Sequence, residues 1–83
     1  MRTPSFTTTA GINLLNLGAT LQEVDQINAA VRELADGAKA GYPVPLLSSL
    51  LGQKMNLYQY VVGRFKVNYT LSKTELVVRS VMA

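Results

Sequence analysis

The side chains that most often carry catalysis or hold metal ions are scarce in this sequence. Its 83 residues include no Cys and no His, and the five carboxylates are Glu23, Asp25, Glu33, Asp36 and Glu75. Without Cys and His the chain lacks the usual zinc ligands, the Ser-His-Asp and Cys-His nucleophile arrangements, and disulfides. We therefore expect no enzyme, with no catalytic residue, no cofactor and no metal site.

The composition indicates a binding or assembling protein of one small domain. Hydrophobic residues make up 48% of the chain and charged residues only 16%, against about 25% charged in ordinary soluble domains. A chain this apolar is expected to have a partner surface. Its net charge of +3 is too mild to require nucleic acid. The uncharged run between Arg2 and Glu23 is too polar for a bilayer span or a secretory signal, so no membrane insertion is expected.

The spacing of apolar residues predicts an all-α fold, an antiparallel helical hairpin. Residues 1–9 are polar and Thr-rich and are expected to be flexible, and residues 10–83 form the hairpin domain. A short first helix is expected over about 13–36, with Gly37 as its C-cap, followed by a Pro/Gly turn at 37–45 that contains Pro43 and Pro45. One long second helix would span about 46–82, although frequent Val and Thr leave an extended conformation open for the turns past Thr70.

The expected second helix has two apolar faces with a polar stripe between them. A 4–3 spacing over more than three heptads gives the first face, and a set roughly opposite gives the second. The residues expected to pack subunits together are Leu51, Met55, Tyr58, Val62, Phe65, Tyr69, Val67, Leu71 and Val78. The stripe is polar, glycine-containing and weakly basic, which suits either a solvated outer face or the wall of a narrow aqueous channel; it includes Asn56, Gln59, Gly63, Lys66, Thr70 and Lys73. Because one short helix covers one face only, further copies of the chain are expected to cover the other.

Several short motifs in order make the sequence similar to type III secretion needle proteins. They are INAAVRELA at 27–35, the proline turn YPVP at 42–45, LL at 46–47, KMNLY at 54–58, and Lys73 followed by Glu75. The resemblance covers about residues 12–80. It implies a structural subunit that polymerises into a hollow helical filament, conducting unfolded effector proteins. It further implies a lumen lined by the polar stripe, with Lys73 near it.

The same resemblance implies partners and a location. The implied partners are copies of the chain itself, the inner rod, the tip protein, chaperones and transiting unfolded effectors. The implied location is secreted, on the surface of a Gram-negative bacterium. The tail LSKTELVVRS at 71–80 is also similar to inner-rod proteins of the same apparatus, so a rod subunit is an alternative.

Two further classes stay open. A small basic helical module could bind nucleic acid, but its cations would be spread around the second helix, so no nucleic-acid partner is expected. Those cations are Lys54, Arg64, Lys66, Lys73 and Arg79. A membrane-surface peptide is the other class, and the narrow polar stripe counts against it.

Overall fold

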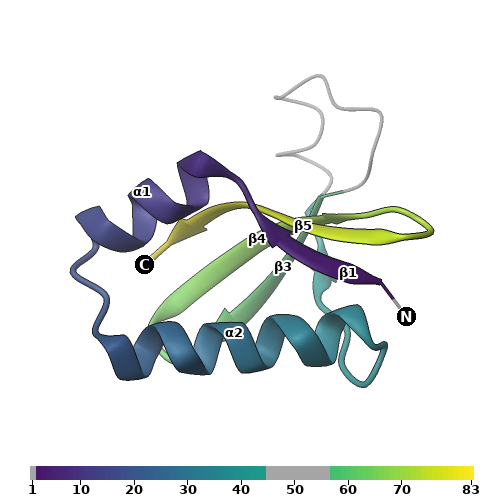
Figure 1. Cartoon of the computed structure of the whole chain (residues 1–83), viewed down its shortest axis with the longest axis horizontal. Coiled ribbons are helices and arrows are strands. Elements are labelled where there is room, and N and C mark those ends of the chain that lie inside the picture. Colours follow the sequence, from purple (N-terminus) through teal and green to yellow (C-terminus); the bar gives the residue numbers. More distant parts are fainter. Residues whose placement is uncertain (1, 45–56) are drawn as a thin grey trace.

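The protein folds as a mixed α/β domain, not as the predicted all-α hairpin. The computed structural model describes residues 2–44 and 57–83. Its elements are β1 (Thr3–Phe6), α1 (Thr8–Asn16), α2 (Leu21–Ala35), β2 (Tyr42–Pro43), β3 (Leu57–Val62), β4 (Phe65–Leu71) and β5 (Glu75–Met82). The strands form one sheet in the order β1-β5-β4-β3-β2, in which β1 and β5 are parallel and the other pairs antiparallel (Figure 1).

The long second helix predicted over about 46–82 is wrong for residues 57–82, which form three antiparallel strands. In β4, the sequence FKVNYTL alternates apolar and polar residues, which is the period of a strand with one buried face. Gly63 has φ +58° in the two-residue loop between Val62 and Phe65. A positive φ at the first loop position is typical of a type II′ hairpin turn, and glycine adopts it without strain. The first part of the predicted helix, including Leu51, Met55 and Asn56, lies outside the described residues.

The first predicted helix, over about 13–36, is divided in the structure, because residues 13–16 are the end of α1 and residues 21–35 form α2. Thr20 begins α2 with a capping box, since its hydroxyl accepts from the Glu23 N–H and its own N–H donates to the Glu23 carboxylate. Gly37, with φ +82°, ends α2 as predicted, and the bonds Gly37 N–H to Leu34 O and Ala38 N–H to Glu33 O form a Schellman motif. Gly18 breaks the predicted helix at φ +66°, so α1 is a separate helix.

The flexible segment predicted for residues 1–9 is instead part of the fold. Residues 3–6 form β1 beside β5, and Thr7 caps α1 through a hydroxyl that accepts from the Ala10 N–H at 3.1 Å. The turn predicted at 37–45 contains Pro43, but Pro43 belongs to strand β2. Pro45 lies outside the described residues.

A single core lies between the sheet and the two helices, which both cover the same sheet face (Figure 1). Helix α2 contributes apolar side chains along one stripe, and the strands contribute every second residue. The buried residues of this cluster are Ala10, Ile27, Val31, Leu34, Ala35, Phe65, Val67, Tyr69, Leu76, Val78 and Val81. No helix in residues 2–44 and 57–83 covers the opposite surface of the sheet, which we call the helix-free face (Figure 1). None of the helices in the described ranges is long and apolar enough to cross a membrane.

Candidate functional site

Those residues predicted to pack subunits together that fall in the described ranges lie on the core side of the sheet. Phe65, Val67, Tyr69 and Val78 are buried, and Tyr58, Val62 and Leu71 pack half-buried against the same cluster. Tyr58 and Tyr69 are cross-strand partners whose rings stack with centroids 5.6 Å apart. Within one chain, the second apolar set of the predicted helix therefore lies on the same face as the first. The filament prediction assumed two separate apolar faces, one of which only further copies could cover. In the structure these residues form a single apolar face, which α1 and α2 of the same chain cover.

The residues predicted to line a lumen divide among three places. Lys66 and Thr70 lie on the helix-free face of β4, and Gln59 lies beside them on β3. Gly63 forms the β3–β4 turn, and Lys73 lies in the exposed turn between β4 and β5. The structure thus keeps the association of Gln59, Lys66 and Thr70 but separates them from the two turn residues.

A row of hydrogen-bonded polar side chains crosses the helix-free face, and we call it the polar ladder: Gln59, Asn68, Thr70, Arg79 and Ser80. The Gln59 side-chain N–H donates to Asn68 Oδ1 at 2.9 Å, and Asn68 Nδ2 donates to Ser80 Oγ at 3.0 Å. Arg79 Nε donates to Thr70 Oγ1 at 3.1 Å. Asn68 is 0% exposed and Thr70 1%. Buried polar groups need such partners, so the ladder fixes its own geometry.

A β-bulge places Arg79 on this face. Tyr69 pairs with Val78, but the next pair is Asn68 with Ser80, so Arg79 is an extra residue without a cross-strand partner. A bulge turns two successive side chains toward the same side of a sheet. Arg79 and Ser80 therefore both join the helix-free face, whereas strict alternation would have placed one of them in the core. Sequence reasoning missed Asn68, although its alternation with apolar residues was a usable signal.

In the described part of the chain, the cations divide into those that form an ion pair with an acid of α2 and those that form none. Arg64 Nε lies 2.7 Å from Glu23 Oε2, and Lys39 Nζ lies 3.1 Å from Glu33 Oε2. The Arg64 hydrogen bonds lower the pKa of Glu23 to about 2, with further help from the Thr20 N–H. Both of these pairs involve acids of α2. In the ranges that the structure describes, Lys66 makes no ion pair, and it is exposed.

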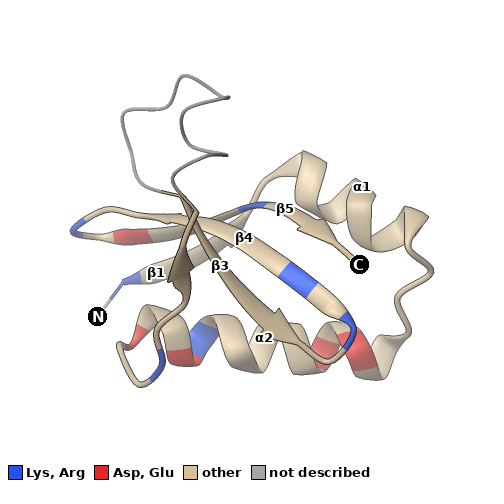
Figure 2. Cartoon of the chain, turned by 180° about the vertical axis from the view of Figure 1, so that it is seen from behind, with Lys and Arg blue, Asp and Glu red and all other residues tan. Residues whose placement is uncertain are grey.

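Arg79 is also exposed and without an ion pair in those ranges, and its side-chain hydrogen bond to Thr70 leaves most of its guanidinium donors available. Acidic residues concentrate on α2, whereas the strands carry mostly basic ones (Figure 2). Glu75 is the single acid on β3, β4 and β5. The helix-free face is therefore positive relative to the helical side.

This arrangement suits binding of an anion-bearing surface. Among residues 2–44 and 57–83, no group of three or more His, Cys, Asp or Glu side chains is placed to hold a metal ion. Comparison with known proteins adds no assignment, since no protein-family model matches the chain and no curated protein is similar to it.

Proposed function

We propose that this chain is a small binding module that holds single-stranded nucleic acid on the helix-free face. The observation that carries the proposal is the pair of exposed cations, Lys66 and Arg79, which both lie on the helix-free face and away from the acids of α2. Cations neutralise phosphates, and the planar Arg79 fork matches phosphate oxygens in pairs. The half-buried Gln59 amide and Ser80 hydroxyl add donors and acceptors for sugars or base edges.

Single strands fit this face better than a duplex. A duplex is usually read by a helix or a two-stranded ribbon that enters the major groove, whereas the side chains here stand on a broad sheet of neighbouring strands. The aromatic residues of β3 and β4, Tyr58, Tyr60, Phe65 and Tyr69, face the core side. Contacts to the backbone should therefore dominate over base stacking, and we expect weak sequence preference.

This proposal departs from the sequence-based expectation of no nucleic-acid partner. That expectation rested on cations dispersed around a long helix. On strands, Lys66 and Arg79 instead share one face of the sheet. Polymerisation into a secretion filament, as needle or rod, and a location on the cell surface stay predictions. The described part of the structure supplies no second apolar helix face to support them.

A salt series tests the proposal. Fluorescence anisotropy of a labelled twelve-nucleotide oligouridine gives the dissociation constant between 50 and 200 mM KCl. With two phosphates neutralised, the slope of log K against log salt should be about −1.4. The double variant Lys66→Gln/Arg79→Gln should lose at least tenfold in affinity and bring the slope near zero.

A matched control removes the same number of charges from the helical side. The variant Arg32→Gln/Lys39→Gln should change the affinity by less than threefold. Equal losses in both double variants would mean that net charge alone drives binding, and would refute a site on the helix-free face. Salt-independent binding, or no binding at 50 mM KCl, would refute the proposal as well.

A further inference from the structure

Two edges of the sheet are closed by prolines. The backbone N–H groups of Thr3 and Thr7 both donate to residues on the β5 side. Because the backbone groups of successive residues in a strand point to alternate sides, those of Pro4 point away from β5. The Val44 N–H bonds to Leu57 on β3, so Pro43 likewise points its backbone away. A proline has no N–H to offer to another strand. Both outer positions are therefore protected from pairing with another chain.

A third stretch of edge has no such protection. Strand β3 runs to Val62, but β2 pairs with it only at Tyr58 and Gln59. The edge of β3 beyond Gln59 is therefore not covered by β2. The chain leaves the edge at Gly41, whose N–H donates to the Tyr69 hydroxyl at 2.8 Å. The turn-closing residue Val62 bonds toward β4, so by alternation the N–H and C=O of Val61 point away from β4. In the described ranges, no partner for them is found.

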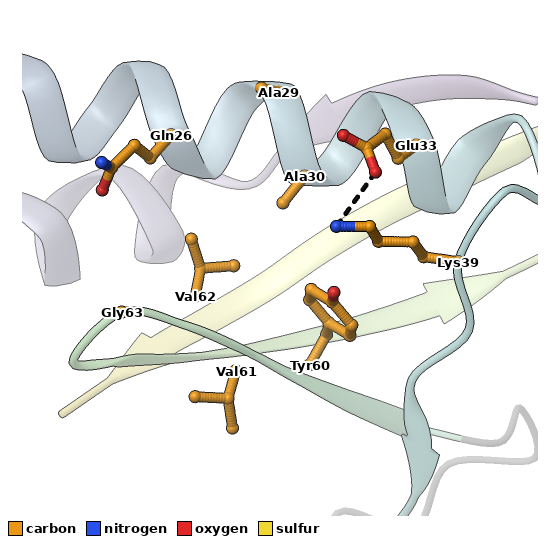
Figure 3. A pocket seen from close by; sticks show the side chains of 9 residues that line it. All are labelled: Gln26, Ala29, Ala30, Glu33, Lys39, Tyr60, Val61, Val62 and Gly63. Carbon is orange, nitrogen blue, oxygen red and sulfur yellow. Dashed lines mark ion pairs between the residues drawn. The ribbon is translucent and has the colours of Figure 1, made fainter.

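A groove of about 440 Å³ runs along this open stretch, between β3 and α2. Figure 3 shows Gln26 and Ala30 of α2 facing Tyr60 and Val62 of β3 across it, and Ala29 adds a second small residue to the helix wall. The short alanine side chains leave room beside the strand. The groove and the unpaired backbone of Val61 therefore form one site with both apolar and hydrogen-bonding surface.

Lys39 lies at the end of this site that is nearest to β2. Its ammonium lies 5.9 Å from the centre of the Tyr60 ring and bonds to Glu33 on α2. An ammonium has three donors, and the side chain is 45% exposed. The Lys39 ammonium at this end of the groove is therefore accessible to the carboxylate of a bound peptide.

We propose that this site binds the carboxyl-terminal segment of a partner protein, which adds a short antiparallel strand beside β3. Such a strand would bond to the N–H and C=O of Val61 and place a small or apolar side chain against Ala29 and Ala30. Running antiparallel to β3, it would travel toward β2 and must stop there. Its terminal carboxylate therefore comes to rest beside Lys39.

The same geometry excludes pairing with β3 of a second copy. If Val61 paired with Val61 of another copy in antiparallel register, the second copy's Gly63 would stand opposite Gln59. That position is already occupied by Tyr42 of β2. An occupant that continues past Val61 meets the same obstacle, so a chain end fits where an internal strand does not.

The test uses a phage library of random heptapeptides displayed with free carboxyl termini. An enriched peptide is synthesised with a free or an amidated terminus, and its dissociation constant is measured by fluorescence polarisation. We expect amidation to weaken binding at least fivefold. Val61→Pro should weaken it at least tenfold, because the substitution removes an N–H that makes no bond to β4 and so leaves the hairpin ladder intact.

A second pair of variants keeps the test sharp if Val61→Pro fails to fold by circular dichroism. Ala29→Arg fills the groove and should also cost tenfold or more, whereas Gln22→Arg adds the same charge to α2 outside the groove and should change binding less than twofold. The proposal is overturned if no peptide is enriched, or if enriched peptides bind Ala29→Arg as tightly as the wild type. Unchanged affinity after amidation, or wild-type dimers that disappear in Val61→Pro, would also overturn it.

Discussion

Replacement of Gly41 by Ala should destabilise the fold sharply, because this position admits no side chain. An added Cβ would lie 2.7 Å from the backbone oxygen of Gln59 and 3.0 Å from Cε1 of Tyr69, and it would clash with the Tyr69 hydroxyl. The Gln59 oxygen is held in the β2–β3 pairing, and Tyr69 is only 2% exposed. Neither can retreat, so the chain at Gly41 must move and give up its bond to Tyr69.

The expected loss in the free energy of unfolding combines two effects. Overpacking costs typically about 1–3 kcal/mol, and a buried hydroxyl that loses its partner costs about 1–3 kcal/mol. A shift of the chain that relieves the overpacking also breaks the hydrogen bond to the Tyr69 hydroxyl. We therefore expect a total loss of about 2–4 kcal/mol. Urea unfolding followed by circular dichroism measures this difference directly.

The matched control is the same substitution in α1. No atom lies within 4 Å of a Cβ built on Gly11, which sits inside the helix. Gly11→Ala should therefore stabilise the protein by about 0.5–1 kcal/mol. The double variant Gly41→Ala/Tyr69→Phe, which lacks the clashing oxygen, should recover part of the loss. A cost for Gly41→Ala below about 0.5 kcal/mol would refute the reasoning about this close approach.

Two further predictions concern the contacts that fix α2 and the polar ladder. The pKa of Glu23 is depressed in the folded state to about 2, so its contribution to stability is present above the unfolded pKa of about 4.3 and is lost as the pH falls toward 2. Glu23→Gln should accordingly flatten the fall of the melting temperature between pH 6 and pH 2.5, and an unchanged pH profile would contradict the Arg64 contact. Asn68→Ala should cost about 1–3 kcal/mol in urea unfolding, since it leaves Gln59 and Ser80 without their side-chain partners; a loss no greater than that of the exposed control Asn16→Ala would contradict the ladder.

The wrong helix prediction for residues 57–82 has a specific physical cause. Along β3 the core-facing residues include Tyr58 and Val62, and along β4 they include Phe65 and Tyr69. Their spacing of four, three and four matches a heptad seam. It also matches two alternating strands joined by a two-residue turn, because the turn shifts the core face from even to odd positions. The spacing alone cannot separate these two structures.

Local signals in the sequence did favour the hairpin. Gly63 sits between two stretches rich in Val, Tyr and Phe, which prefer strands, and Gly–X is a typical two-residue turn. Strict alternation from Phe65 to Leu71 pointed the same way. The 4–3 spacing favours a helix over these signals because it continues for more than three heptads. Frequent Val and Thr leave an extended conformation open only past Thr70, whereas β3 begins thirteen residues earlier, at Leu57.

The sequence by itself determined the features that depend on neighbours along the chain. The lack of Cys and His limited the available chemistry, and Gly37 marked the end of α2, because a capping glycine acts within a few residues. Tertiary structure alone decided which side chains share the helix-free face and where the sheet edge stays open. Those depend on pairing between segments far apart, such as β1 with β5, and on the bulge at Arg79. The register of β1 beside β5 is set by contacts between the two ends of the chain, so no local pattern could have specified it.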